Sequence, residues 1–513
     1  MTAKLIISGA SCASPEILLI SYVPKNLIKM KLNKLIIASV FAAGALFASA
    51  DNLIILHTND THSQLDPTDK NEGGILRRKA LIDSVRAEQP NVLLIDCGDM
   101  VQGTLYFSIY KGEAERDMMN NLGYDIQILG NHEFDNGIES IAQVWSGLNA
   151  EKLTSNYDLR DTALDSIFKP YTIKEYGGKR IGFIAINLDP KGMIADSNTG
   201  GIKYIDGIKA ANSLAWFLKN IERVDAVIAL THVGYDTHNP PTPSDVDIAR
   251  SSEDIDIIIG GHSHTTINPA AEKTPEYLIP NAAGDSILVV QTGGRGLYLG
   301  EITLDLESMT PAYRLIPVDS RLDNRIYPEA AALLANYRKG VDALKMEKIG
   351  KMAQELPHGS HMTVNWVADV MFEKGSELTD RKVDLSLVNK GGIRRGLPAG
   401  HITKELIMTM LPFDNKLVVM EIKGSDLKAA LDVFAGKNGD GISAGFDPNA
   451  IIPDKIYTLV TIDYLANGGD YLATLTNGNV IARSALRLDE TMIDYILSQK
   501  GKNIKYNDNR RRL

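Results

Sequence analysis

The chain has very little cysteine, with only Cys12 and Cys97 among 513 residues. Two thiols cannot build a disulfide framework or a cysteine-rich zinc site, so the fold and any metal binding must depend on other residues. An excess of positive charge is also lacking, since 64 acidic residues outnumber 54 basic ones and give a formal net charge of −10. Such a surface repels phosphate backbones, which argues against nucleic acid as a partner. A small phosphorylated molecule is not excluded, because a metal ion or a few arginines can outweigh the net charge locally.

Long apolar runs are rare, and the clearest one lies near the start of the chain, at residues 35–47. It is too short to span a bilayer comfortably, it follows Lys31 and Lys34, and it precedes Ala48-Ser49-Ala50. These three parts in this order predict a signal peptide at residues 30–50 rather than a buried core helix. We interpret residues 1–29 as an upstream extension, and we expect a periplasmic or secreted product with no membrane anchor after signal cleavage.

Five short apolar runs have the length of buried strands, and each is followed by polar residues: residues 53–56, 92–95, 126–129, 226–230 and 255–259. Stretches of helical character lie between several of them, at residues 74–88 and 208–222 for example. Alternating strands and helices predict a layered α/β domain. Folds of this kind usually present their catalytic groups at the ends of strands.

The character of the sequence changes near residue 320. Residues 327–345 are rich in Ala, Leu, Lys and Glu, with Pro328 near the start, and predict a connecting helix. We therefore expect two α/β domains, at residues 51–320 and 348–513, joined by a helical linker at residues 321–347. The arginine-rich tail at residues 509–512 is expected to be solvated.

The polar residues that follow the predicted strands have the chemistry of metal ligands. Each one alone is as well explained by a turn or by a structural histidine. Together they offer imidazole, carboxylate and amide oxygen donors without cysteine, which suits a centre of two divalent cations better than a structural zinc site. Asp99, the only candidate ligand at the end of its strand, fits a bridge between the two metals. The residues are Asp60, His62, Asp99, Asn131, His132, His232, His262 and His264.

The motifs around these residues resemble those of the calcineurin-like metallophosphoesterases. The longer strings, HTNDTHS at residues 57–63 and GNHEFD at residues 130–135, resemble in particular the secreted bacterial 5′-nucleotidase and UDP-sugar hydrolase family. The resemblance covers nearly all of residues 51–513. It implies a metallophosphoesterase domain followed by a 5′-nucleotidase C-terminal domain that binds the substrate.

The resemblance also implies roles for individual residues. It implies two divalent cations, which could be Zn, Mn, Co or Mg, and a catalytic dyad in which Asp135 orients His132. Two cations lower the pKa of a bridging water, which supplies hydroxide near neutral pH. Many relatives have glutamine at the position of His264. One metal would be held by Asp60, His62, Asp99 and His264, and the other by Asp99, Asn131, His232 and His262.

Residues of the C-terminal half resemble the family's nucleotide site. The loop from Asn389 to Arg394 would bind the substrate, with Asn389 at the base, Gly392 permitting close backbone approach and Arg394 on the phosphate. Phe413 and Tyr464 match the two positions that sandwich the nucleobase, and Asp470 matches a residue that binds ribose hydroxyls. The alternative is that both aromatic residues belong to the core.

The expected function is metal-dependent hydrolysis of nucleoside 5′-monophosphates, and in addition of other nucleotides and UDP-sugars, for extracytoplasmic nucleotide salvage. Three alternatives stay open: a 2′,3′-cyclic-nucleotide phosphodiesterase with 3′-nucleotidase activity, a thiosulfate-ester hydrolase of the same architecture, and a non-catalytic nucleotide-binding protein. The sequence leaves open the preferred nucleotide, the physiological metals, the oligomeric state and the true start codon.

One segment departs from the family pattern. Relatives usually carry a phosphate-binding arginine shortly before the segment that matches residues 365–369, whereas residues 354–364 contain neither Arg nor Lys. His358 and His361 lie there instead. Either histidine could replace the arginine, or the segment could be a solvated loop with no part in the site.

Overall fold

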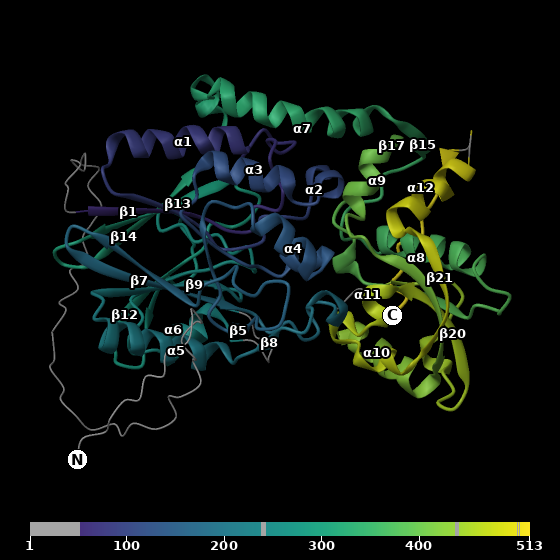
Figure 1. Cartoon of the computed structure of the whole chain (residues 1–513). Coiled ribbons are helices and arrows are strands. Elements are labelled where there is room, and N and C mark those ends of the chain that lie inside the picture. The colour runs from purple at the N-terminus through teal and green to yellow at the C-terminus, as the bar shows by residue number, and fades with distance from the viewer. Residues whose placement is uncertain (1–51, 237–242, 437–440, 500, 502) are drawn as a thin grey trace, which may run out of the picture. The chain divides into compact units, whose positions relative to one another are not determined.

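The computed structural model describes residues 52–236, 243–436, 441–499, 501 and 503–513 (Figure 1). The predicted upstream extension and signal peptide lie outside these residues. No helix within the described ranges is both long and apolar enough to cross a membrane.

Two six-stranded mixed sheets form the N-terminal domain. The first has the order β14-β13-β1-β2-β3-β4, in which β1 to β4 are parallel and β13 and β14 are antiparallel. Its strands are β1 (Asn52–Thr58), β2 (Val92–Asp96), β3 (Ile126–Ile128), β4 (Glu151–Leu153), β13 (Tyr298–Asp305) and β14 (Pro311–Pro317).

The second sheet has the order β11-β12-β10-β9-β7-β6, with parallel strands at its centre and antiparallel strands at both edges. A separate two-stranded pair, β5 (Tyr157–Asp158) with β8 (Lys203–Tyr204), lies outside it. The strands of the second sheet are β6 (Tyr171–Tyr176), β7 (Lys179–Asn187), β9 (Ala226–His232), β10 (Ile257–Ile259), β11 (Leu278–Pro280) and β12 (Ser286–Val290).

The two sheets pack face to face, and helices cover their outer sides. Alternate residues of β1 point to opposite faces: Leu53 and Ile55 belong to the core between the sheets, whereas Ile54 and Leu56 pack in the core beneath the helices. Figure 1 shows α1 and α3 beyond the first sheet and α5 and α6 beyond the second. This arrangement confirms the predicted layered α/β fold. The helices are α1 (Ile75–Glu88), α2 (Leu105–Tyr110), α3 (Glu113–Leu122), α4 (Ile138–Trp145), α5 (Gly207–Phe217) and α6 (Asp245–Ser251).

The packing of the sheets determines where the polar strand ends meet. Strands β1, β2 and β3 are parallel neighbours in one sheet, and β9 and β10 are parallel neighbours in the other. The carboxyl ends of parallel neighbours lie at one edge of a sheet, which is where open α/β folds bind their ligands. All five apolar runs that were predicted as strands are strands in the structure.

The predicted helices match the structure with one exception. The run at residues 327–345 is α7 (Pro328–Met346), which has proline in its first turn as expected. The run at residues 208–222 does not remain α-helical, because α5 passes at Leu218 into a π-helical turn (Leu218–Glu222) that ends at Arg223 in the left-handed conformation.

The C-terminal domain is built on a five-stranded mixed sheet of order β19-β16-β20-β18-β21 and a three-stranded sheet of order β17-β15-β22. Helix α8 packs on β16, β19 and β20. The strands are β15 (Lys348–Met352), β16 (Leu385–Val388), β17 (Gly400–Thr403), β18 (Lys416–Lys423), β19 (Gly441–Ile442), β20 (Ile456–Ile462), β21 (Asn479–Arg487) and β22 (Asn503–Ile504). The helices are α8 (His361–Ser376), α9 (Lys404–Met410), α10 (Gly424–Gly436), α11 (Asp463–Ala466) and α12 (Leu488–Ser498).

The expectation of a solvated tail is wrong for Arg512. Its guanidinium forms a two-pronged ion pair with Asp369 of α8, at 2.7 and 2.8 Å, and its side chain is 10% exposed. The amide of Asn365 also donates hydrogen bonds to the carbonyls of Asp508 and Arg510. The tail is held on α8 because partners that are distant in sequence satisfy its charge.

Candidate metal and substrate site

The backbone at the strand ends adopts a conformation that most residues avoid. Asp60, His62, Asp99, His262 and His264 all have φ between +46° and +78°. Left-handed backbone is uncommon outside glycine, although Asp, Asn and His tolerate it best, and it gathers at functional sites because surrounding structure must hold it. Five of the seven predicted metal ligands therefore lie on backbone of high energy.

One cluster of ligand atoms joins β1 and β10 through Asp60, His62 and His264, whose nearest side-chain nitrogen or oxygen atoms lie within 4.8 Å of one another. The Nε2 atoms of His62 and His264 are 2.8 Å apart, and Nε2 of His264 is 3.3 Å from Oδ1 of Asp60. Asp60 and His62 are buried, whereas the side chain of His264 is 45% exposed. The cluster is thus open to solvent on the His264 side.

A second cluster contains Asp99, His232 and His262, again within 4.8 Å of one another. Nε2 of His232 lies 3.2 Å from Oδ2 of Asp99, and Oδ1 of Asn131 lies 2.8 Å from Nδ1 of His262. The other ring nitrogen of His232 contacts the backbone carbonyl of Cys97 at 2.7 Å. This contact fixes the ring so that Nε2 faces Asp99, as in many histidine ligands of metals.

The charges of the site favour a cation. Burial disfavours the charged form of His232, but the carboxylates of Asp99 and Asp60 outweigh burial and raise its pKa to about 10. Burial raises the pKa of Asp99, but the nearby His232 and His132 outweigh burial and hold that pKa well below its usual range. Burial lowers the pKa of His62 to about 3 and that of His262 to about 4, so both rings stay neutral. A divalent cation requires neutral imidazoles, so at His232 it would take the place of the proton that the two carboxylates favour.

The donor set fits two divalent cations. Within the described ranges, Nε2 of His232 is buried and makes no hydrogen bond of good geometry, although Oδ2 of Asp99 lies 3.2 Å from it. Unsatisfied buried nitrogens are costly unless a ligand meets them. Imidazole, carboxylate and amide donors suit Zn, Mn or Co, and the carboxylates also suit Mg.

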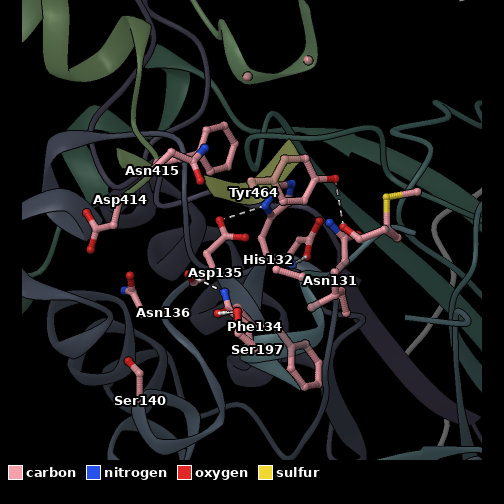
Figure 2. Close-up of a pocket in the computed structure, with 18 of the residues that line it drawn as sticks. Asn131, His132, Phe134, Asp135, Asn136, Ser140, Ser197, Asp414, Asn415 and Tyr464 are labelled. Carbon is pink, nitrogen blue, oxygen red and sulfur yellow. Dashed lines mark hydrogen bonds and ion pairs between the residues drawn. The ribbon is translucent and has the colours of Figure 1, made fainter. Parts of the chain in front are cut away.

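The predicted dyad is assembled in a 3-10 turn, η1 (His132–Asn136), directly after β3. Nδ1 of His132 lies 3.0 Å from Oδ2 of Asp135 (Figure 2). The backbone N–H of His132 donates to Oδ1 of Asp99 at 2.8 Å. Burial opposes protonation of His132, but Asp135 and Asp99 outweigh it and raise the pKa of the ring. Ring atoms of His132 also lie within 4.8 Å of ligand atoms of His62 and Asp99, so the ring is within reach of a metal as well.

Arg394 reaches the dyad from the C-terminal domain. Its Nη2 lies 3.3 Å from Nε2 of His132, and its guanidinium carbon lies 5.7 Å from the centre of the Phe413 ring. The Phe413 ring in turn stacks on His132 with 5.9 Å between ring centres. The predicted phosphate ligand and one predicted base-stacking residue therefore meet at the dyad.

A cavity of about 990 Å³ connects the parts of the site. Asp60, His62 and His232 are not among the described residues that line it. Figure 2 shows His132, Asp135 and Tyr464 directed into this space. The predicted residues that line it are Asp99, Asn131, His132, Asp135, His262, His264, Asn389, Gly392, Arg394, Phe413, Tyr464 and Asp470.

The predicted base and ribose residues are linked by short contacts. The amide of Asn389 donates to the carboxylate of Asp470 at 2.5 Å, and the backbone N–H of Asp470 donates to the hydroxyl of Tyr464 at 3.1 Å. Asn389 and Asp470, which are 81 positions apart, therefore face one pocket.

The two histidines offered as substitutes for the missing arginine lie elsewhere. Neither His358 nor His361 is among the described residues that line the cavity. Nε2 of His358 lies 3.2 Å from the carbonyl of Ile393, so this ring contacts the backbone next to Arg394. The geometry favours a supporting loop over a direct phosphate contact.

Several residues near the site are not predicted by the sequence. Gln102 is buried and its Oε1 lies 3.5 Å from Nη2 of Arg394, while Asn198 bonds the backbone of the dyad turn. For Gln102, the only indication in the sequence was a polar residue directly after the apolar Met100 and Val101. Asn198 stands in a Ser-Asn-Thr-Gly-Gly run that indicates only a turn.

Comparison with family models divides the chain into two matched regions. Residues 53–266 match the model of the calcineurin-like phosphoesterases, and residues 344–477 match the model of the 5′-nucleotidase C-terminal domain. The first region contains every strand end that carries a candidate ligand. Fold and site together define the class as a calcineurin-like phosphoesterase, a class that uses divalent metals.

Comparison with known proteins agrees with this class. The chain is 29% identical to the 5′-nucleotidase of Mus musculus over 82% of this chain and 84% of that protein. It is 27% identical to a probable 5′-nucleotidase of Treponema pallidum over 77% of each. It superimposes on the crystal structure of a 5′-nucleotidase precursor from Thermus thermophilus with a TM-score of 0.75, 28% identity and coverage of 89% and 98% of the two chains. The chain belongs to the 5′-nucleotidase family and is a phosphoric ester hydrolase.

Proposed function

We propose that the chain hydrolyses nucleoside 5′-monophosphates to nucleoside and inorganic phosphate with two divalent cations. The observation that carries the proposal is the single cavity, since it joins both ligand clusters and the His132–Asp135 pair to Arg394 and Tyr464. Water is added across the ester bond: its oxygen joins phosphorus, and a proton reaches the 5′ oxygen of the departing nucleoside.

The proposed ligands are those that the motifs predict. Asp60, His62 and His264 with Asp99 would hold one cation, and Asn131, His232 and His262 with Asp99 would hold the other. Divalent cations at these positions supply Lewis acidity and acidify bound water near neutral pH. Asp99 is the proposed bridge because, among the described residues, it is the carboxylate whose ligand atoms cluster both with His62 and with His232.

We propose that His132 and Asp135 act as the dyad. With its Nδ1 at Asp135, His132 presents Nε2 to the cavity, where it can stabilise charge on the phosphoryl group or hold a proton near the leaving oxygen. Arg394 would grip phosphate oxygens beside it, because a guanidinium offers two parallel donors.

The remaining proposed contacts select the nucleoside. Phe413 and Tyr464 would stack on the base, an interaction worth about 1–3 kcal/mol per base that accepts different bases. Asn389 and Gly392 would approach the base and the phosphate end, and Asp470 would accept hydrogen bonds from ribose hydroxyls. We place the catalytic domain at residues 51–320, the helical linker at 321–347 and the substrate domain at 348–513.

We also propose export and a role in nucleotide salvage. The predicted signal peptide at residues 30–50 supports a periplasmic or secreted enzyme. Charged nucleotides cross membranes poorly, so dephosphorylation outside the cytoplasm would release nucleosides for uptake.

A phosphate-release screen tests the proposal. Metal-free protein is supplied with Mn²⁺, Co²⁺, Zn²⁺ or Mg²⁺ and offered AMP, UMP, ADP, 3′-AMP, 2′,3′-cyclic AMP and UDP-glucose. We expect 5′-monophosphates to give the highest kcat/KM, with weaker turnover of ADP and UDP-glucose. Preference for cyclic AMP or 3′-AMP would assign the chain to the phosphodiesterase alternative, and nucleotide binding without turnover would exclude catalysis.

A further inference from the structure

Residues 189–198 form a segment that contributes to the wall of the cavity and has so far been given no functional role. It leaves β7 and ends in a 3-10 turn, η2 (Asp196–Asn198). It belongs to the N-terminal domain, yet none of its residues carries a predicted role. The residues of this segment that line the cavity are Met193, Ile194, Ala195, Ser197 and Asn198.

One end of the segment holds the dyad turn. The side-chain amide of Asn198 donates to the backbone carbonyls of Phe134 and Asp135, at 3.0 and 3.1 Å. Both carbonyls belong to η1, the turn that carries His132 and Asp135. One amide that joins two successive carbonyls restrains their peptide planes, and hence the direction in which the Asp135 side chain leaves the backbone.

The other end of the segment touches the predicted base pocket. The hydroxyl of Tyr464 donates to the carbonyl of Met193 at 3.4 Å and accepts from the N–H of Asp470 at 3.1 Å. Gly192 has φ +78°, and a Cβ added there would lie 2.6 Å from Cδ1 of Tyr471. The close approach of the segment to the 464–471 turn therefore depends on glycine at this position.

We propose that residues 189–198 form a positioning and specificity segment, in which Asn198 positions the His132–Asp135 dyad and Gly192 allows the segment to support the Tyr464 side of the nucleobase pocket. The segment is continuous, so one stretch of chain supports both the base pocket and the dyad turn, and each end acts on its own part of the site. This inference rests on the proposed hydrolysis of nucleotides, and it adds residues that neither the motifs nor the ligand clusters contain.

The dyad end is tested by Asn198→Ala. We expect kcat to fall about 10- to 100-fold for AMP and for p-nitrophenyl phosphate alike, because a catalytic group displaced by about 1 Å loses rate of this order. The KM values and the metal content should stay unchanged. Asn120→Ala is the matched control: Asn120 likewise bridges two backbone groups, at Gly147 and Asn149, but it does not line the cavity.

The pocket end is tested by Gly192→Ala. We expect the KM for AMP to rise about tenfold, within the range that weakened base stacking permits, while the KM for p-nitrophenyl phosphate stays the same. Gly178→Ala is the control, because Gly178 has φ +77° but a Cβ added there would meet no atom of the described residues within 4 Å. Gly178→Ala therefore introduces the same backbone strain as Gly192→Ala but makes no close contact like that with Tyr471.

The outcomes separate the inference from the proposed function. Unchanged kcat in Asn198→Ala, or a rise of KM for both esters in Gly192→Ala, would overturn the inference. If the parent enzyme does not prefer AMP over p-nitrophenyl phosphate, the proposed function fails whatever the variants do. Should Asn198→Ala not fold, the isosteric Asn198→Asp carries the same test, because its carboxylate cannot donate to the two carbonyls.

Discussion

Nη2 of Arg394 lies 3.3 Å from Nε2 of His132, although the two residues are 262 positions apart in the chain. A guanidinium has only donors, so this contact requires Nε2 to accept and places the ring proton on Nδ1, which faces Asp135. One contact between domains therefore defines the tautomer of the proposed catalytic histidine and brings the proposed phosphate ligand to it.

Arg394→Ala should raise the KM for AMP and lower kcat/KM about 10- to 100-fold, which corresponds to the loss of a charge-assisted hydrogen bond of about 1.5–3 kcal/mol. Steady-state kinetics with AMP measure this effect. Arg395→Ala is a neighbouring control, since Arg395 pairs with Glu405 at 3.2 Å and does not line the cavity. Equal losses in both variants would mean that Arg394 acts through general charge rather than through contact.

Asp99→Asn should be the most damaging of the ligand substitutions, because the proposed bridge serves both cations. We expect both metals to be lost or greatly weakened, with activity near background even in excess Mn²⁺. Metal analysis of the purified variant checks this directly. Asp489→Asn removes an equally buried carboxylate that pairs with Arg487 and should retain full metal content.

His132→Asn should leave two metals per chain while lowering kcat by about 10²- to 10⁴-fold, the range typical of a general acid–base group. His401→Asn, at an exposed position of β17, should have no effect. Loss of a metal from His132→Asn would instead make this residue a ligand, a role that its proximity to His62 and Asp99 permits.

Glu133→Gln should weaken metal binding without contacting a metal. The Glu133 carboxylate accepts hydrogen bonds from the backbone N–H groups of Asp99, Met100 and Gly130, at 3.0, 2.9 and 2.5 Å, and so ties two ligand loops together. The glutamine side chain replaces one carboxylate oxygen, which accepts hydrogen bonds, by an NH₂ group, which donates them and so repels the backbone N–H groups. We expect the Kd for Mn²⁺ to rise about 10- to 100-fold, as for other outer partners of metal ligands.

Competition with a fluorescent chelator measures that Kd. Glu301→Gln is the control, because Glu301 is also buried but pairs with Arg314 away from the ligand loops. An unchanged Kd in Glu133→Gln would mean that the loops keep their geometry without the carboxylate.

Acid should weaken the fold partly through Glu151. Burial raises the pKa of this carboxyl, but hydrogen bonds from Lys174, Thr172 and Lys169 outweigh burial and lower the pKa from 4.5 to about 2. The charged form is favoured in the folded chain, so its stabilisation is complete above the unfolded pKa and is lost as the pH falls from 4.5 to 2.

Urea unfolding of Glu151→Gln at several pH values checks this prediction. The variant should lose less stability than the parent between pH 4.5 and pH 2. Glu175→Gln changes an exposed carboxylate of β6 and should follow the parent curve. Identical slopes for all three proteins would remove Glu151 from the acid response.

The strands and their polar ends could be predicted because both are encoded locally. An apolar run such as residues 226–230 followed by Thr-His specifies a buried strand and its terminus within a few residues. The layered fold then follows from alternation with helices, and it brings the strand ends together without any knowledge of individual contacts.

Other features could not be predicted because they depend on partners remote in sequence. Asn198 serves a turn that lies more than 60 positions earlier, and Arg512 is held by Asp369. The apolar residues around Leu218 have the same spacing whether α5 continues as an α-helix or changes to a π-helical turn. The choice between the two depends on backbone hydrogen bonds, which the sequence pattern does not show.

The left-handed backbone of Asp60, His62, Asp99, His262 and His264 limits how this site can change in evolution or in the laboratory. Each position requires a side chain that can bind a cation and a residue that tolerates positive φ. Glycine tolerates positive φ but offers no ligand atom, whereas glutamate and cysteine can bind a cation but tolerate positive φ poorly. Libraries that aim to alter metal preference should therefore be restricted to Asp, Asn and His at these positions, with glutamine added at position 264 as in the family pattern, since most other replacements would change the shape of the loop before they could test a new ligand.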